Sequence, residues 1–284
     1  MSTRIRLQEY GVGLFKSAFT KSALKKALKK NYITVNEHIA TSATYIQGGE
    51  CIKLEIPKDS VVTKSLIFKL TILFEDDYLA IIHKPAGILV SSNSFKTIAN
   101  ALGQNLKRST RIDATKPQPV HRLDYATTGI LMVGKTSSSI RDLNQLFRAK
   151  AIKKTYFAVT IGKMETEGDL NADIDTKTSQ TTYKVLATVT SKRFGCLNLV
   201  QLQPKTGRRH QLRKHLSGIG NPILGDKTYG KKDLILNGQG LYLHAHALHF
   251  KHPFTNNVLT IKDPLPKRFL KLFAAEILKI ENNS

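Results

Sequence analysis

The sequence predicts an α+β protein whose main sheet is mixed and largely antiparallel. Segments with a strand pattern outnumber segments with a helix pattern, and the two kinds do not alternate strictly as they do in proteins with a parallel sheet. The chain has 284 residues, 41% of them hydrophobic, which is enough for one medium domain and a small accessory one. Helices are expected to flank the sheet.

Residues 1–60 have the pattern of a small separate module. Thr20 can cap a helix whose apolar residues share one face and whose lysines cover much of the rest. Short strands are expected at residues 33–35 and 51–56, with turn signals at Asn36-Glu37 and Gly48-Gly49 between them. A basic helix beside short strands can lie along a phosphate backbone or can simply face solvent, and the pattern leaves both possibilities open.

Residues 61–284 are expected to form the larger domain, after a break at Pro57. The polar stretch 91–119, with Pro117 and Pro119, predicts a surface excursion that holds one short helix. Ser137 or Ser138 can cap the next helix. Strands are expected at 72–74, 79–82, 129–134, 156–161, 182–189, 197–202 and 241–250, a short helix at 211–216 and a closing helix at 266–280.

Charge is the outlying bulk property of the chain. Its 44 Lys and Arg residues against 21 Asp and Glu give a formal net charge of +23, which indicates a polyanionic partner such as a nucleic acid. Cys51 and Cys196 form no metal-type pair, so a reducing compartment is expected. The first residues lack the apolar core of a signal peptide, and no apolar run could span a bilayer. We therefore expect a soluble, cytoplasmic protein without a membrane partner.

Four clusters carry candidate chemistry. In 121–129, Arg122 and Asp124 are two residues apart and point the same way in an extended stretch, which suits a catalytic pair or an ordinary ion pair. Residues 205–215 place a glycine and several basic and amide side chains at the mouth of a short helix, which suits an anionic ligand or a buried carboxylate. Tyr156 opens a strand after Lys153-Lys154-Thr155, and taken alone it suits an aromatic at the edge of the core better than a catalytic group. His244 and His246 could share a strand face, but no carboxylate or cysteine lies at ligand spacing, so no metal site is predicted.

Six segments together resemble the RluA-type pseudouridine synthase family. They run in consistent order over most of residues 70–265, and the agreement of six ordered motifs is highly specific. The first module resembles, more weakly, the RNA-binding domain named after ribosomal protein S-four, with lysines in place of its usual arginine-rich helix. The six segments are EDDYLAIIHKPAG (75–87), HRLDYATTGILMVGKT (121–136), KKTYFAVTIG (153–162), TGRRHQLRKHL (206–216), NPILGDKTYG (221–230) and LHAHALHFKHPF (243–254).

The resemblance implies the pseudouridine synthase fold and a set of site residues. Asp124 would be the catalytic aspartate, Tyr156 the tyrosine against the target base, and Arg213 the arginine that pairs with the aspartate. Arg122 would enter the RNA stack where the uridine leaves, and Leu212 would line the pocket. The remaining candidate substrate-binding residues are His121, Thr127, Arg208, Gln211 and Lys84.

The implied reaction detaches uracil from ribose, rotates it and rejoins it through carbon, after the base has been flipped out of its stack. Because uracil stays in the pocket, no cofactor is expected. Asp124 can act as a nucleophile or as a base, and the sequence leaves both routes open. Large-subunit ribosomal RNA is the expected partner, transfer RNA the second, and a monomer is expected.

Two rival functions remain at this point. A glycosidase-like hydrolase would require a second acid near Asp124 and would release free uracil. A non-catalytic RNA-binding or ribosome-assembly protein would carry a degenerate site, and the presence of Asp124, Tyr156 and Arg213 argues against it. The cluster at 205–215 lacks the spacing of a Walker loop, so a nucleotide cofactor is not expected.

Overall fold

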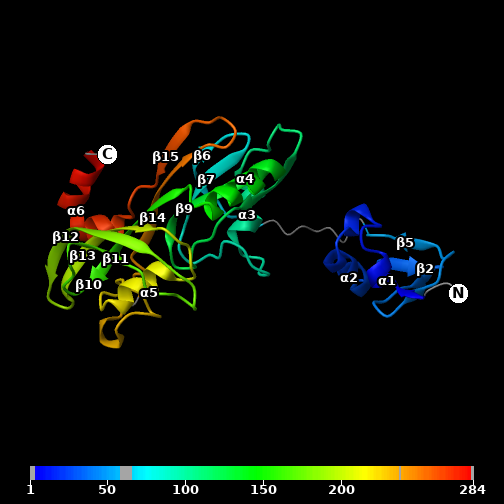
Figure 1. The fold of residues 1–284 in the computed structure, drawn as a ribbon, viewed down its shortest axis with the longest axis horizontal. Coiled ribbons are helices and arrows are strands. Elements are labelled where there is room, and N and C mark those ends of the chain that lie inside the picture. The colour runs from blue at the N-terminus through cyan, green and yellow to red at the C-terminus, as the bar shows by residue number, and fades with distance from the viewer. Residues whose placement is uncertain (1–3, 58–65, 237, 283–284) are drawn as a thin grey trace. The chain divides into compact units, whose positions relative to one another are not determined.

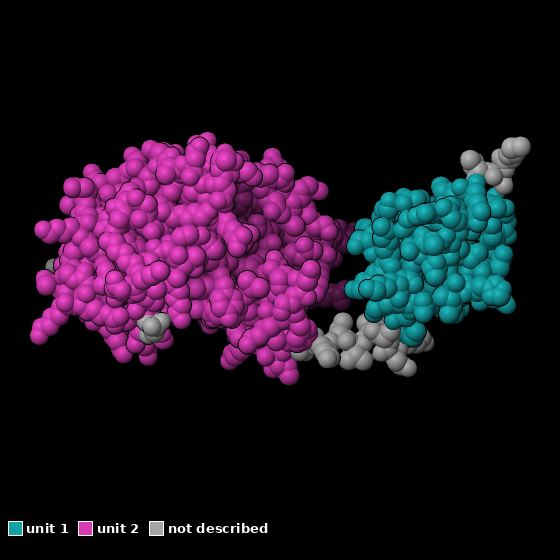
Figure 2. All heavy atoms as spheres, turned by 90° about the horizontal axis from the view of Figure 1, so that it is seen from below, with its two compact units in different colours: residues 1–64 teal, residues 65–284 magenta. Residues whose placement is uncertain are grey.

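The computed structural model describes residues 4–57, 66–236 and 238–282. It divides into two compact units, residues 1–64 and residues 65–284 (Figure 2). The domain boundary predicted at residue 60 lies outside the described residues. Each unit has its own hydrophobic core, so each is described by itself.

The smaller unit is built around a helix, α2, that begins where the sequence predicts. The Thr20 hydroxyl caps it by accepting a hydrogen bond from the Ala23 N–H at 3.2 Å, and Leu24 and Leu28 are buried on its inner face. Three strands form an antiparallel sheet, and two more pair separately. The elements are β1 (Ile5–Arg6), α1 (Leu7–Tyr10), η1 (Lys16–Ala18), α2 (Lys21–Lys29), β2 (Ile33–Val35), β3 (His38–Ile39), β4 (Tyr45–Ile46) and β5 (Ile52–Leu54).

The larger unit contains one ten-stranded, mixed and mostly antiparallel sheet (Figure 1). Its main path runs β11-β12-β13-β10-β14-β9-β7-β6, while β15 pairs with β14 and β8 pairs with β9. This confirms the predicted fold class. The strands are β6 (Thr71–Glu75), β7 (Leu79–Lys84), β8 (Ala114–Pro119), β9 (Thr128–Thr136), β10 (Lys153–Ile161), β11 (Glu167–Leu170), β12 (Thr181–Ser191), β13 (Gly195–Pro204), β14 (Leu243–Lys251) and β15 (Val258–Lys262).

Four helices cover this sheet. Alternate residues of β7 and β9 face α3 (Ile98–Asn105) on one side and α4 (Ser137–Arg148) on the other, as the two-residue period of a strand requires. The half of the sheet that contains β10 and β13 packs against α5 (Gln211–Gly218) and α6 (Lys267–Asn282). A short 3-10 helix, η3 (Lys232–Leu234), lies between α5 and β14 along the chain.

The two halves of the sheet join at β9 and β14, which pair in parallel over only two residues. At this junction Gly129 has a positive φ of 114°, and a Cβ there would collide with the backbone of Ala245. Only glycine permits this close approach. The junction therefore fixes where β9 begins, and with it the segment that carries Asp124 just before β9.

The structure corrects the sequence predictions at a few boundaries. Thr136 caps α4 instead of Ser137 or Ser138, and Ser139 completes a capping box with it. The predicted excursion 91–119 holds the expected short helix, but it also contains β8, and the strands β11 and β15 were not predicted. In the described parts of the chain, no helix is long and apolar enough to cross a membrane.

Candidate active site

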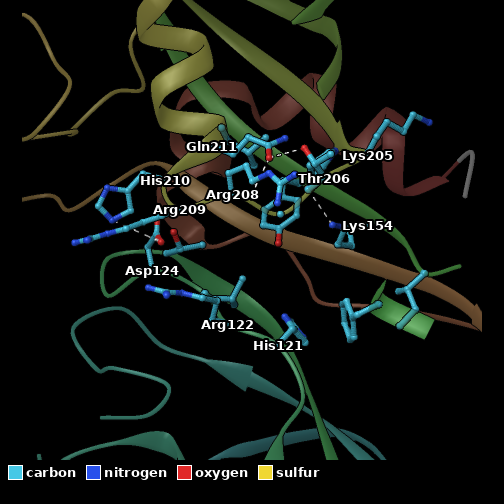
Figure 3. A pocket seen from close by; sticks show the side chains of 18 of the residues that line it. His121, Arg122, Asp124, Lys154, Lys205, Thr206, Arg208, Arg209, His210 and Gln211 are labelled. Atoms are coloured by element: carbon cyan, nitrogen blue, oxygen red, sulfur yellow. Dashed lines mark hydrogen bonds and ion pairs between the residues drawn. The ribbon is translucent and has the colours of Figure 1, made fainter. Parts of the chain in front are cut away.

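A pocket of about 900 Å³ opens beside the junction of β9 and β14. The segment before β9 supplies His121, Arg122 and Asp124, and these face side chains that precede or begin α5 (Figure 3). Among the described residues that line the pocket, Asp124 is the sole acidic side chain. The basic side chains that line it are Arg122, Arg148, Lys150, Lys153, Lys154, Lys205, Arg208, Arg209 and Arg213.

Asp124 lies between two nitrogen-bearing side chains without a short hydrogen bond to either. Its Oδ2 is 3.6 Å from Arg213 Nη1, and its Oδ1 is 3.8 Å from His210 Nε2. Its side chain is 17% exposed, so it remains open to the pocket. A carboxylate in this position has a cation beside it and free lone pairs, which is what a nucleophile or a general base needs.

Arg213 is anchored from behind by Asp226, a residue to which the sequence assigned no role. Arg213 Nε and Nη2 donate to the two carboxylate oxygens of Asp226 at 2.7 and 2.9 Å. Burial opposes both charges, but hydrogen bonding and the attraction between opposite charges together outweigh it, so the pKa of Arg213 is raised and the pKa of Asp226 is lowered. The guanidinium therefore stays charged next to Asp124.

His210 is fixed in the same way by Tyr229. Its Nδ1 lies 2.9 Å from the Tyr229 hydroxyl, and its backbone has a positive φ of 55° at the start of α5. Burial lowers the pKa of His210, although the Asp124 charge opposes that effect, so the ring is neutral near neutral pH. The cluster at 205–215 was expected to suit an anionic ligand or a buried carboxylate. In the structure its Arg213 lies beside the carboxylates of both Asp124 and Asp226, and its His210 lies beside Asp124.

Lys84 was predicted to bind substrate, and the structure contradicts this. Its side chain is fully buried, and its ammonium group donates to the carbonyl oxygens of Pro85, Tyr125 and Thr127 at 2.9, 3.3 and 2.8 Å. Three acceptors use all three donors of a lysine. Burial lowers the pKa of Lys84 to about 8, against the raising effect of Asp124. Lys84 thus holds the turn that carries Asp124 and is not available to RNA.

Gln211 lines the pocket, but its amide is already bonded within the protein. It is 4% exposed, and its amide oxygen accepts from the Thr206 hydroxyl and the Arg208 N–H. Its amide nitrogen donates to the carbonyl of Gln180 and the hydroxyl of Thr181, both at 2.9 Å. With every group of the amide paired, Gln211 shapes the loop before α5, and its predicted contact with substrate stays a prediction.

Tyr156 and Leu212 lie in the pocket wall. Tyr156 lies within β10, next to a bulge at Thr155. Its strand neighbours are Leu202 and Ala245, and its side chain packs against two of the hydrophobic clusters. Burial, with the nearby Asp124 charge, raises the pKa of Tyr156, so the phenol keeps its proton. Leu212 is buried in the same wall. Together they give this wall of the pocket an apolar surface.

The other predicted residues divide into exposed and enclosed groups. Arg122 and Arg208 are exposed at the pocket, and Arg208 Nε donates to the Thr178 carbonyl at 3.1 Å. The buried Thr127 hydroxyl has no hydrogen-bond partner among the described residues. His121 Nε2 accepts from the Met132 N–H at 2.9 Å, and burial lowers the pKa of His121 to about 3, so this ring is neutral.

A second group of titratable side chains, which we call the sealed cluster, contains His244 of β14 with His83 and Asp263 and does not line the pocket. His244 is fully buried, with Nδ1 2.9 Å from the Thr128 hydroxyl and Nε2 3.2 Å from the Asp263 carbonyl. The Asp263 carboxylate lies 2.6 Å from His83 Nδ1. Across the described residues, no group of three or more His, Cys, Asp and Glu side chains has the arrangement of a metal site.

Comparison with known proteins decides the family. The sequence profile of a family described as RNA pseudouridylate synthase matches residues 78–218. Ribosomal large subunit pseudouridine synthase D of Nitrosomonas europaea is 31% identical over 90% of this chain and 80% of its own length. The chain belongs to the RluA-type pseudouridine synthases. It is an isomerase that converts uridine in RNA to pseudouridine.

Other relatives agree with this assignment. Ribosomal large subunit pseudouridine synthase C of Yersinia pestis is 30% identical, and the match covers 86% of this chain and 84% of that protein. The solved structure of human RNA pseudouridylate synthase domain containing 4 is 27% identical with a TM-score of 0.57. It covers 70% of this chain and 90% of its own.

Sequence reasoning missed three residues that shape this synthase's site: Asp226, Tyr229 and the inward role of His210. The motif NPILGDKTYG contains the first two, and it was recognised without a reason for its charged and aromatic members. A lone acid after the apolar and turn residues 221–225 was the signal available. It indicates a buried carboxylate, which requires a cationic partner from elsewhere in the chain.

Proposed function

We propose that this synthase modifies uridine in large-subunit ribosomal RNA and that Asp124 is its catalytic carboxylate. The observation that carries the proposal is the state of Asp124, which is flanked by Arg213 and His210 and has no hydrogen bond shorter than 3.5 Å to either. The names of the relatives C and D, which refer to the ribosomal large subunit, support the choice of RNA. The net charge of +23 suits a large folded polyanion.

The reaction requires the target base to leave its stack, because a stacked uridine cannot reach a carboxylate inside a pocket. Arg122 is exposed at the pocket and suits the role of filling the vacated space and stacking there. The uracil then lies against Tyr156 and Leu212. The N1–C1′ bond breaks, the C5–C1′ bond forms, and a proton leaves C5 while N1 gains one, so no cosubstrate is consumed.

Asp124 begins this sequence either by attacking C1′ or by removing a sugar proton, and both routes start from the ionised carboxylate. Arg213 favours that charge state. Tyr156 keeps its proton, because burial and the Asp124 charge raise its pKa, so its role is to hold the detached uracil during rotation and to help exclude water. His121 and Thr127 complete the wall around the ribose.

The structure offers no second acid for a glycosidase-like hydrolysis among the described residues that line the pocket. Asp226 is the nearby carboxylate, but its side chain is 1% exposed and both oxygens accept from Arg213. An inaccessible, fully paired carboxylate cannot protonate a leaving group. This argues for isomerisation, in which uracil is retained.

Incubating the purified protein with unmodified large-subunit ribosomal RNA tests the proposal. We expect pseudouridine at one or a few positions, the same positions that become unmodified in cells that lack the protein. Modification of transfer RNA alone would overturn the choice of substrate. Release of free uracil would overturn the reaction and favour hydrolysis.

We further propose that residues 1–64 help to hold large RNA and that the reaction takes place in the cytoplasm. The lysines of α2 lie on the face opposite its buried leucines, where they can contact phosphates. A chain that begins at residue 66 retains the complete core of the larger unit. It should fold and still modify short RNA, but bind large RNA less well; equal rates on large RNA would remove the recognition role.

A further inference from the structure

Arg213 lies between two carboxylates, and it is hydrogen-bonded to only one of them. Its Nε and Nη2 make a two-bond contact with Asp226, at 2.7 and 2.9 Å, while its Nη1 remains 3.6 Å from Asp124. A separation of 3.6 Å is an ion pair without a hydrogen bond. The guanidinium therefore stabilises the charge of Asp124 while leaving its lone pairs free.

Nothing in Arg213 itself would keep this distance. An arginine beside a carboxylate ordinarily closes into two parallel N–H···O bonds, because the two groups match in shape. Here that geometry is already used on the buried side, since Asp226 occupies two of the three guanidinium nitrogens. Asp226 is fixed in turn, because its Oδ1 accepts the N–H groups of Thr228 and Tyr229 at 2.9 and 3.0 Å.

We infer that Asp226 is a positioning residue of the catalytic centre: it tethers Arg213 so that the guanidinium stays at ion-pair distance from Asp124 and does not close on it. This inference rests on the proposed role of Asp124. Asp226 itself is 1% exposed at its side chain and does not line the pocket, so it acts through Arg213 and not on RNA.

The test compares Asp226→Asn with a matched control at Asp175, the ion-pair partner of Lys214, which is the next residue of α5 after Arg213. Lys214 Nζ donates to Asp175 at 2.8 Å, but Asp175 is 66% exposed and lies outside the pocket. Asp175→Asn therefore removes an equivalent charge without touching the site and should keep the wild-type rate. Asp226→Asn should lower the single-turnover rate about 100-fold, the cost of a misplaced group, while RNA affinity stays unchanged.

The pH–rate profile distinguishes two roles of Asp226. In one it keeps Arg213 at ion-pair distance from Asp124, and in the other it only supports the side chain of Arg213. The charged or titratable side chains near Asp124 are Lys84, Tyr156, His210 and Arg213. In Asp226→Asn the released guanidinium closes on Asp124, so the acid limb of the profile should stay in place or move to lower pH. In Arg213→Met the cation is gone, so the acid limb should move to higher pH. An upward move in Asp226→Asn would overturn the tether.

The double variant Arg213→Met/Asp226→Asn keeps the test open if Asp226→Asn fails to fold. It removes both members of a buried pair, which proteins tolerate better than removal of one. Because Asp226 acts through Arg213, the double variant should have the rate of Arg213→Met alone. A further loss of ten-fold or more would show an independent role and overturn the inference.

Failure of the inference and failure of the proposed function give different results. If the wild type forms pseudouridine and Asp124→Asn does not, the proposed function stands. If Asp226→Asn then has the same rate and the same pH–rate profile as the wild type, only the inference about Asp226 is overturned. If Asp124→Asn keeps the wild-type rate, the role of Asp124 is wrong and the tether falls with it.

Discussion

Two groups of titratable side chains lie beside the β9–β14 junction, and they differ in how completely they are bonded. In the pocket, Asp124 is 17% exposed, and Arg213 and His210 lie 3.6 and 3.8 Å from its carboxylate oxygens. In the sealed cluster, His244 is fully buried with contacts of 2.9 and 3.2 Å, and His83 meets Asp263 at 2.6 Å. Crowding of such groups therefore does not by itself indicate a reactive site.

The difference follows from what surrounds each group. A buried polar atom that lacks a partner costs about 1–3 kcal/mol, so the contacts of the buried His244 and Asp263 serve stability. The pocket departs from this rule at the buried Thr127 hydroxyl, which has no partner among the described residues, and Asp124 also stays incompletely bonded because Arg213 is held back by Asp226. The comparison predicts that substitutions in the pocket affect rate and that substitutions in the sealed cluster affect stability.

The largest effect is expected for Asp124→Asn. The amide has the same shape but is neither nucleophilic nor basic, so pseudouridine formation should fall by about 10⁴-fold or more. Thermal unfolding and RNA affinity should match the wild type, since the side chain lies at a pocket and makes no short side-chain contact. Release of tritium from C5-labelled uridine measures the rate. A variant with substantial activity would remove the basis of the comparison.

Arg213→Met should lower the rate by roughly 10²–10³-fold, the usual cost of one electrostatic partner in an active site. Asp124 would lose a nearby cation and would be protonated more easily, so residual activity should rise with pH where the wild type is flat. Single-turnover assays with excess RNA check this. If Arg213 only bound a phosphate, excess RNA would restore the full rate.

Arg122→Ala should have an effect that depends on the RNA. Unstacking a base costs a few kcal/mol only where stacking exists, so the loss should be roughly ten-fold greater on structured RNA than on a short flexible strand. Arg141→Ala, which removes an arginine whose side chain is 70% exposed and outside the pocket, controls for lost charge. Equal losses on both substrates would place Arg122 in the bond chemistry instead.

The sequence predicted most of this arrangement, because the motifs that carry Asp124, Tyr156 and Arg213 are local and ordered. It did not predict β8, because Pro117 and Pro119 argue against a strand. Within the described chain β8 pairs with β9 alone, and an unpaired side tolerates proline.

The partner of Arg213 could not be chosen from sequence either. Asp124 and Asp226 are both available acids, and only the path of the chain after α5 decides which one receives the two-bond contact. One role was also assigned wrongly. Lys84 is buried and fully bonded, and no feature of its motif separates a residue that supports the site from one that touches RNA.

The smallest effect on activity is expected for His244→Gln, in the sealed cluster. Glutamine can accept from Thr128 and donate to the Asp263 carbonyl, as the histidine ring does. At neutral pH the rate should therefore stay within a few-fold of the wild type. A loss comparable to that of Arg213→Met would mean that the two groups are coupled through Thr128, and the comparison would fail.

The same variant should change how stability depends on pH. Burial lowers the pKa of His244 from 6.5 to about 4, against the raising effect of Asp263, while His246 and His83 lower it further. The unfolded chain therefore takes up a proton below pH 6.5 that the folded protein resists, so the free energy of unfolding falls between pH 6.5 and about 4. A shift of that size corresponds to about 3 kcal/mol.

His121, whose pKa is lowered to about 3, should leave part of this pH dependence of stability in His244→Gln. Denaturant unfolding of both proteins at pH 7 and pH 4.5 measures the difference: the wild type should lose more stability than the variant, and equal losses would show that the sealed cluster does not resist protonation.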